Sequence, residues 1–561
     1  MRHIITTLLI AIAFGLNANA QTVLRGPYLQ MPTSSSMTVM WRTDVASTGR
    51  VYYGTSLATV MDNFVDEGSS TENHSVSLTG LQPYTEYFYA VSDGSNVLAG
   101  GDNDHRFTTS PEIGTEQPIN VWAIGDFGKG NSKQVAVKEA YLNHIGEDFP
   151  DMWLWLGDNA YPDGTDEEYT ETVFEPTYGY PELLTRVPFM ATPGNHDYLS
   201  VYNLITGADP ETHDGPYYDV VDVPTNGEIG GVPSGYELYY SFDYGNVHFM
   251  SLNSEIGSPL NEMWDWTGVS PFYTFDGSPF IDWIHADLQA NDKQWVVAFI
   301  HQPPHTDGSH ESGTFYEVFM EAVRENICPV LESYGVDLLI AGHSHVYERS
   351  YLVNGFYGLP NDFSASQHLV DGSSGNLADG EPYIKYKDGP NQNLGTMYIV
   401  QGNSGSTESE AGLEHPVMYA GHGCDTCVGS TMLYIHGDTL SGEYLTKDGE
   451  ILDEWTIIKQ PDPNSSVDEG TAFPVSGIEV YPNPFQTETT IQFEVYQDLW
   501  ANVELIDLKG QILHELAKGK MTPGTKKYAI NAADLGLAKG AYLIRVITDK
   551  RPAIARIIKL E

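Results

Sequence analysis

Side chains that can bind a metal ion recur in this sequence directly after short apolar runs. The runs and their polar ends read NVWAIGDFG, MWLWLGDNAYPDG, VPFMATPGNHD, WVVAFIHQPPH and VDLLIAGHSHVYER. The candidate ligands that they carry are Asp126, Asp158, Tyr161, Asn195, His301, His343 and His345. Such a set could coordinate two metal ions, and a phenolate beside carboxylates suits a hard ion such as Fe(III). The pattern predicts a dinuclear metal site.

The elements that position these groups are predicted to be buried strands. Apolar runs of about 4 to 8 residues bounded by glycine or proline, such as residues 152–156, are typical of strands buried on both faces of a sheet. Between them, residues 132–146 and 316–335 repeat apolar side chains at helical spacing. In open α/β sheets, ligands bind beyond the carboxyl ends of the strands. We therefore expect the candidate ligands to meet at one edge of a sheet with helices on its faces.

Two of the histidines have a spacing that suits a pair of metals. His343 and His345 lie at positions i and i+2 just past a strand, so their side chains can point the same way. Two metals about 3.5 to 4 Å apart can hold both the attacking and the departing oxygen of an in-line displacement. This geometry favours phosphoryl transfer to water.

The five blocks resemble a known family. GDFG, GDNAY, GNHD, FIHQ and GHSH are similar, in order, to the motifs of the calcineurin-like metallophosphoesterases, over about residues 118–459. Tyr161, three residues after Asp158, narrows the resemblance to the purple acid phosphatases. The resemblance implies a two-sheet core in which Asp126, Tyr161 and His345 hold Fe(III). It further implies that Asn195, His301 and His343 hold a divalent Fe, Zn or Mn ion, and that Asp158 bridges the two metals.

The same resemblance implies roles for histidines that are not ligands. A metal-bound hydroxide would attack phosphorus, and His196 would hydrogen-bond the phosphate or the attacking water. His310, nine residues after His301, is similar to the family's leaving-group acid, a role that suits the pKa of histidine. His305 in the same HQPPHTDGSH loop is the competing candidate, and spacing alone leaves both open.

The function predicted from these residues is that of a secreted acid phosphatase acting on small phosphomonoesters. A phosphodiesterase or nucleotide pyrophosphatase on the same fold is the first alternative, because leaving-group specificity lies in the loops. A catalytically inactive cell-surface binding protein is the second.

The 561 residues predict a multidomain protein. Residues 1–20 have the pattern of a signal peptide, and no later stretch reaches the roughly 18 apolar residues of a membrane span. Residues 21–112 predict an all-β sandwich that resembles a fibronectin type III-like domain. Residues 118–460 form the expected α/β metallophosphoesterase domain, and residues 461–476 form a polar linker. Residues 477–561 predict a small all-β sandwich.

The last of these segments, which begins with VYPNPF near residue 480, resembles the C-terminal sorting domain of type nine secretion substrates in Gram-negative bacteria. This resemblance implies export through that machinery and a secreted or cell-surface location. The segment has 11 Lys and Arg against 10 Asp and Glu, whereas the whole chain has a formal charge of -49. Such an acidic chain argues against nucleic acid as a partner, because nucleic-acid binding needs lysine and arginine to neutralise phosphates.

The sequence contains three cysteines. Cys424 and Cys427 form a C-x-x-C, for which an oxidising compartment favours a local disulfide over a metal or redox site. Cys328 is expected to be a buried apolar residue.

Overall fold

The computed structural model describes residues 21–200, 215–255, 279–308, 310–314, 317–407, 414–463, 478–496, 498–506, 512–548 and 553–560. The expected signal peptide at residues 1–20 and most of the expected linker at 461–476 lie outside this described part. The chain divides into two compact units, residues 1–385 with 393–460, and residues 386–392 with 461–561. Within the described residues, no helix is long and apolar enough to cross a membrane.

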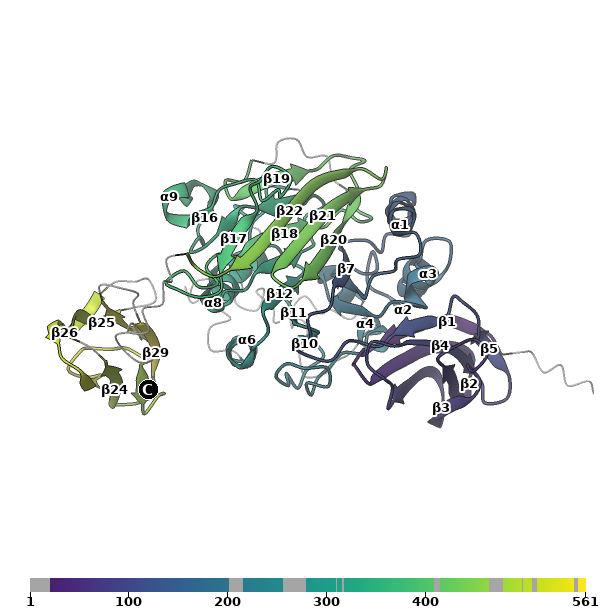
Figure 1. Ribbon diagram of the computed structural model, residues 1–561, viewed down its shortest axis with the longest axis horizontal. Coiled ribbons are helices and arrows are strands. Elements are labelled where there is room, and N and C mark those ends of the chain that lie inside the picture. The colour runs from purple at the N-terminus through teal and green to yellow at the C-terminus, as the bar shows by residue number, and fades with distance from the viewer. Residues whose placement is uncertain are drawn as a thin grey trace, which may run out of the picture. The chain divides into compact units, whose positions relative to one another are not determined.

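The N-terminal domain of the first unit is built from strands (Figure 1, purple). They are β1 (Val23–Gln30), β2 (Ser36–Gly54), β3 (Asn63–Thr79), β4 (Glu86–Ser92), β5 (Val97–Gly100) and β6 (Arg106–Thr108). The hydrogen-bonded order is β1-β2-β4-β5, with β3 paired to β2 and β6 to β4. The long β2 strand pairs β1 through its first part and β4 through Arg50–Gly54, so the strands fold over one core. Trp41, Tyr89 and Phe107 are buried in that core.

This domain is joined to the central domain by polar contacts and by shared packing. Arg25 of β1 lies 2.7 Å from Asp166, and Arg42 of β2 lies 2.5 Å from the other oxygen of the same carboxylate. Tyr28 Oη donates to the carbonyl of Val220, and the Tyr28 ring belongs to the core of the central domain. The two domains therefore share packed interior.

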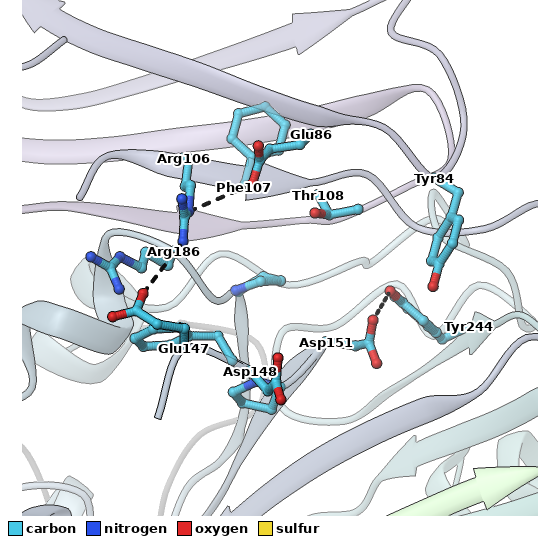
Figure 2. Close-up of a pocket in the computed structure, with 13 residues that line it drawn as sticks. Tyr84, Glu86, Arg106, Phe107, Thr108, Glu147, Asp148, Asp151, Arg186 and Tyr244 are labelled. Atoms are coloured by element: carbon cyan, nitrogen blue, oxygen red, sulfur yellow. Dashed lines mark hydrogen bonds and ion pairs between the residues drawn. The ribbon is translucent and has the colours of Figure 1, made fainter. Parts of the chain in front are cut away.

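A pocket of about 440 Å³ lies at another place along this seam (Figure 2). Arg106 faces Glu86 and Glu147 across it, at 3.6 and 3.9 Å, while Asp151 accepts a hydrogen bond from Tyr244 at 3.1 Å. Some of the residues that line this pocket directly precede strands of the central domain. None of the candidate metal ligands lines it. This pocket is therefore a feature of the domain seam and not the candidate site.

The first central sheet has the order β17-β22-β21-β20-β7-β8-β9, in which β7, β8 and β9 run parallel. Its strands are β7 (Ile119–Ile124), β8 (Met152–Leu156), β9 (Phe189–Thr192), β17 (Tyr383–Tyr386), β20 (Gly429–His436), β21 (Thr439–Thr446) and β22 (Ile451–Gln460). All five residues of β8 are buried, which confirms the strand predicted from its apolar run.

The second central sheet has the order β10-β11-β12-β13-β18-β14-β19, in which β11, β12, β13 and β18 run parallel. Its strands are β10 (Tyr240–Tyr244), β11 (Val247–Ser251), β12 (Trp295–Ile300), β13 (Leu338–Ala341), β14 (Tyr347–Ser350), β18 (Met397–Gln401) and β19 (Met418–His422). Short strands β15 (Leu352–Val353) and β16 (Leu369–Asp371) pair beside it. Both sheets contribute to one buried core, and Arg349 of β14 ties them through a bidentate contact with Asp453 of β22.

Helices cover the outer faces of the two sheets. On the side of the first sheet lie α1 (Ser132–Ile145), α2 (Asp166–Tyr169), the π-helix η1 (Thr170–Phe174), α3 (Pro181–Leu184) and α4 (Pro216–Val220). On the side of the second lie α6 (Pro279–Ala290), α7 (Val318–Ala322), the π-helix η3 (Val323–Ile327) and α8 (Cys328–Tyr334). Asn131 caps the first turn of α1, and Gly146 ends it with φ at +60°. The prediction of a two-sheet α/β core flanked by helices is confirmed.

The helix predicted over residues 316–335 is divided into α7, η3 and α8. Pro329 in the first turn of α8 has no N–H with which to continue the i to i−4 pattern, and the chain forms a π turn just before it. Two short 3-10 helices, η2 (Asn195–Tyr198) and η4 (Pro360–Asp362), and the short helix α9 (Ala365–His368) are the remaining helices in the described part of the first unit.

The second unit forms the predicted small β domain. Its strands are β23 (Glu479–Tyr481), β24 (Glu488–Val495), β25 (Leu499–Ile506), β26 (Ile512–Met521), β27 (Gly524–Asn531), β28 (Gly540–Ile547) and β29 (Ala553–Lys559). They form two sheets, β23-β24-β27 and β26-β25-β28-β29. Phe493, Val503 and Ile544 belong to the buried core of this unit.

A buried ion network makes the stability of the central domain depend on pH. His248 of β11 lies 2.8 Å from Asp243 and 2.8 Å from Asp287, so each ring nitrogen faces a carboxylate. Burial lowers the pKa of His248, but the hydrogen bonds to Asp243 and Asp287 raise it more, to about 9. The pKa of His248 in the folded protein thus exceeds its ordinary value of 6.5. The free energy by which the protonated His248 stabilises the folded state is fully present below pH 6.5 and is lost as pH rises through about 9.

We expect the stability difference between the wild type and His248→Gln to shrink as pH rises from 6.5 to above 9. Urea unfolding at several pH values measures this difference. The exposed His436 supplies the control, because His436→Gln should show no such change. A difference that stays constant with pH would contradict the prediction.

Candidate metal centre

The candidate ligands follow the ends of parallel strands in both sheets. Asp126 follows β7, Asp158 follows β8, Asn195 follows β9, His301 follows β12, and His343 follows β13. Parallel strands bring their carboxyl ends to one edge, and here both sheets present that edge to the same place.

Three of these residues adopt a backbone conformation that is rare for side chains other than glycine. The φ angles are +54° at Asp126, +52° at Asp158 and +67° at His343. Left-handed non-glycine residues cost of order 1–3 kcal/mol each and cluster at functional sites. Each follows a glycine directly after its strand, so the same sharp turn aims all three side chains at the edge.

Close packing behind the ligands also depends on a glycine. At Gly157, φ is +89°, and an added Cβ would lie 2.3 Å from His301 Nδ1. A larger residue there would displace the imidazole.

A first group of candidate ligands contains the predicted Fe(III) set. The Tyr161 hydroxyl lies 3.0 Å from Asp126 Oδ1, 2.8 Å from Asp158 Oδ2 and 3.4 Å from His345 Nε2. His345 Nε2 is also 3.4 Å from Asp126 Oδ1. The structure thus brings together the side chains that the sequence assigned to one metal.

A second group contains the predicted ligands of the divalent ion. His301 Nε2 lies 3.1 Å from Asn195 Oδ1, 3.3 Å from Asp158 Oδ1 and 3.2 Å from His343 Nδ1. Asp158 therefore points one oxygen at each group, which is the arrangement expected of a bridging carboxylate.

The atoms of the second group can coordinate a cation together more readily than they can all hydrogen-bond with one another. His301 Nδ1 lies 2.9 Å from the carbonyl oxygen of Leu156, so this nitrogen carries the proton that it donates. In the neutral ring, Nε2 then presents a lone pair to the oxygens of Asn195 and Asp158. A proton on Nε2 could satisfy only one of these acceptors, whereas a metal ion can accept electron pairs from all of them. The residues present could therefore hold a metal.

The pKa values show how strongly the buried charges interact. Burial raises the pKa of Asp126, but the hydrogen bond from His345 and the charges of His301 and His343 bring it down to about 2. Burial lowers the pKa of His343 to about 4. Burial, together with Asp126 and Asp158, holds the pKa of the Tyr161 phenol well above 10. Only a strong Lewis acid would ionise that phenol at neutral pH.

Asp197 organises the ligand loops, and sequence reasoning did not single it out. Its fully buried carboxylate accepts hydrogen bonds from the backbone N–H groups of Asn159 and Gly194 and from Tyr169 Oη. Burial and the charge of Asp158 raise the pKa of Asp197 to about 7. The sequence feature that could have identified Asp197 is its place in the GNHD motif, directly after His196.

Two of the predicted catalytic histidines lie on the open side of the site. The His196 side chain is 31% exposed, and its Nε2 lies 3.9 Å from Asp158 Oδ2. Its Nδ1 donates to the carbonyl of Pro162, which leaves Nε2 facing the carboxylate. The His310 side chain is 35% exposed, and its ring lies 4.1 Å from that of His343.

His305 requires a correction. Its ring is buried and packs against Phe356, Tyr398 and His415, in the apolar core beneath the helices of the second sheet. Burial and the nearby His415 lower the pKa of His305 well below 6.5. Of the two loop candidates, His310 is the one whose ring lies beside the candidate ligand His343, so it is the better placed candidate for the general acid.

Two further residues beside the ligands were not predicted. Glu317 accepts a hydrogen bond from His310 Nδ1 at 2.9 Å, and Lys129 Nζ lies 3.2 Å from the centre of the Tyr161 ring. Burial raises the pKa of Glu317, but the contacts with His310 and His343 lower it to about 2. Neither residue belongs to a sequence motif that would have identified it as a neighbour of the candidate ligands.

Family models match three parts of the chain. Residues 119–347 match the calcineurin-like phosphoesterase model. The central domain is a calcineurin-like phosphoesterase domain. Residues 25–109 match the model of the purple acid phosphatase N-terminal domain, and residues 479–560 match that of a secretion system C-terminal sorting domain. The family resemblances predicted from the sequence motifs are confirmed.

Individual relatives agree with this phosphoesterase domain. Purple acid phosphatase 15 of Arabidopsis thaliana is 28% identical over 326 residues, which cover 54% of this chain and 53% of that relative. An acid phosphatase of Aspergillus ficuum is 24% identical, with coverage of 56% and 68%. A purple acid phosphatase from yellow lupin (Lupinus luteus) seeds shares the fold, with a TM-score of 0.55 at 19% identity over 77% of this chain and 74% of that one. The chain spans 53 to 62% of the length of purple acid phosphatases 15, 22 and 23 of Arabidopsis thaliana.

The last prediction from the sequence is a disulfide between Cys424 and Cys427. Cys424 and Cys427 form a disulfide, and Cys328 is free and buried, as expected.

Asp158→Ala should remove both metals, because Asp158 is the side chain that faces both groups of ligands. We expect about two metal ions per chain in the wild type and nearly none in the variant, measured by elemental analysis after dialysis. Asp163→Ala, an exposed carboxylate in the same loop, should keep its metals. A variant of Asp158 that retained both ions would show that this residue is not the bridge.

Proposed function

We propose that this protein is an exported, dinuclear-metal acid phosphatase that hydrolyses small phosphomonoesters. The observation that carries the proposal is that two groups of candidate ligands meet at Asp158. Tyr161, which contacts Asp126 and His345, faces Oδ2, and His301, which contacts Asn195 and His343, faces Oδ1. The phosphoesterase domain and the purple acid phosphatase relatives support the same reaction class. The sorting-domain match supports export to the medium or the cell surface.

The donor set suits one trivalent and one divalent ion. Tyr161, Asp126 and His345 offer the harder set for Fe(III), and Asn195, His301 and His343 offer the set for Fe, Zn or Mn. When bound, such a pair would acidify water and withdraw charge from the phosphate.

The chain's own residues would then orient the ester and handle its proton. His196 and His310 are the more exposed members of the site, so a phosphate entering from solvent would meet them first. His196 Nε2 is placed to hydrogen-bond a phosphate oxygen, because its Nδ1 is already held by Pro162. His310 would give its proton to the departing oxygen as the bond from phosphorus to that oxygen breaks.

A visible spectrum tests the Tyr161 assignment. A tyrosinate bound to Fe(III) absorbs in the visible range through charge transfer. We expect Tyr161→Phe to lose this band and to keep its fold, because only the hydroxyl is removed. Tyr178→Phe, at the protein surface, should keep its colour. A coloured Tyr161→Phe variant would show that another residue is the charge-transfer ligand, and a colourless wild type with two metals would favour a zinc or manganese enzyme.

Rates on para-nitrophenyl phosphate and on bis(para-nitrophenyl) phosphate separate the proposal from its alternatives. Both esters release para-nitrophenolate. The ratio of their kcat/KM values therefore measures how strongly a second ester group on the phosphate changes the rate of hydrolysis. A monoesterase should prefer the first by at least about tenfold, a difference of about 1.4 kcal/mol. A preference for the diester would support a phosphodiesterase, and metal-free protein without either activity would support an inactive binding protein.

A further inference from the structure

We propose that Glu317 is a positioning residue that holds both the general acid His310 and the metal ligand His343. This inference rests on the proposed function and names a residue for which neither the sequence motifs nor the comparisons give a role. Glu317 lies just before α7, with its side chain 19% exposed. One of its oxygens faces each histidine.

The contact with His310 fixes where that ring carries its protons. Glu317 Oε1 lies 2.9 Å from His310 Nδ1, and a carboxylate can only accept a hydrogen bond. Nδ1 is therefore protonated, and Nε2 is the nitrogen that can deliver a proton to the departing oxygen. In the doubly protonated ring, Glu317 balances the positive charge. As the bond from phosphorus to the leaving oxygen breaks, the Nε2 proton moves to that oxygen and Nδ1–H stays with Glu317.

The contact with His343 concerns its second nitrogen. His343 Nδ1 faces the candidate ligands, 3.2 Å from His301 Nε2. Its buried Nε2 has no hydrogen-bond partner within the described part of the chain, and Glu317 Oε2 lies 3.8 Å away. A histidine that binds a metal through one nitrogen commonly donates the other N–H to a carboxylate. A shift of less than 1 Å would bring Glu317 Oε2 to hydrogen-bonding distance.

The packing of the two rings explains why one carboxylate can serve both. The His310 and His343 rings lie 4.1 Å apart with an interplanar angle of 39°. Because the rings are this close, one carboxylate can present Oε1 to His310 Nδ1 and Oε2 to the side of His343 Nε2. The same three side chains place donor atoms within 4.8 Å of one another, so an extra metal ion is the competing occupant.

The test compares Glu317→Gln with Glu321→Gln, one turn further along, where the carboxylate faces Arg324 and Glu325 instead. The first readout is kcat/KM on para-nitrophenyl phosphate, which has a good leaving group, and on propyl phosphate, which has a poor one. A weakened general acid costs most when the leaving group is poor, so we expect a loss of about 10-fold on the aryl ester and about 100-fold or more on the alkyl ester. Glu321→Gln should match the wild type on both.

The second readout is metal binding, measured by titrating the metal-free protein with Zn²⁺ and by elemental analysis. We expect Glu317→Gln to bind the divalent ion about 10- to 100-fold more weakly, because His343 would lose its acceptor. Equal losses on both esters together with unchanged Zn²⁺ affinity would overturn the proposal. A third Zn²⁺ ion per wild-type chain that Glu317→Gln fails to bind would overturn it in favour of a metal site. If the wild type hydrolyses neither ester, the proposed function fails, and the Zn²⁺ titration alone still decides the role of Glu317 toward His343.

Discussion

The burial of closely spaced charged and polar side chains is the constraint on which the rest of this structure depends. Asp126 and Asp158 are buried, and His301 Nε2 lies 3.1 Å from Asn195 Oδ1 and 3.3 Å from Asp158 Oδ1. Buried carboxylates cost free energy unless cations or hydrogen-bond donors lie beside them. The fold must therefore hold these groups and their partners in place, and the strained backbone at Asp126, Asp158 and His343 shows part of the cost.

The support for the ligands extends into the N-terminal domain. Arg25 of β1 holds Asp166 in α2, and Tyr169 at the end of α2 donates to Asp197. Asp197 in turn binds the backbone of Asn159 and Gly194, which flank the ligands Asp158 and Asn195. The N-terminal domain carries no candidate ligand, yet a chain of polar contacts, partly exposed at Asp166 and buried at Asp197, links it to the loops of two candidate ligands. Contacts of the N-terminal domain thus reach the backbone that carries Asp158 and Asn195.

Exposure divides the site into a fixed interior and an accessible rim. Among the candidate ligands, Asp126, Asp158, Tyr161, His301 and His343 are buried, and Asn195 and His345 are partly buried. His196 and His310 are about one third exposed. The interior sets the charge and geometry that metals require. The rim holds the groups that can exchange protons with a substrate. Metal ions held in the interior would determine the local field, so a chain with a formal charge of -49 could still accept an anionic ester.

The sequence by itself determined the strands and the polar side chains that follow them, because strand-length apolar runs and the residues after them are local features. Met152–Leu156 is an example, since five buried residues and one turn suffice to place Asp158. Only the tertiary structure decided between His305 and His310, because the path of a loop depends on what packs against it, and Phe356 and Tyr398 draw His305 into the core. Asp197, Glu317 and the contact of Arg25 with Asp166 were likewise beyond the sequence. Their roles come from partners up to 141 residues away, and no local spacing encodes such distances.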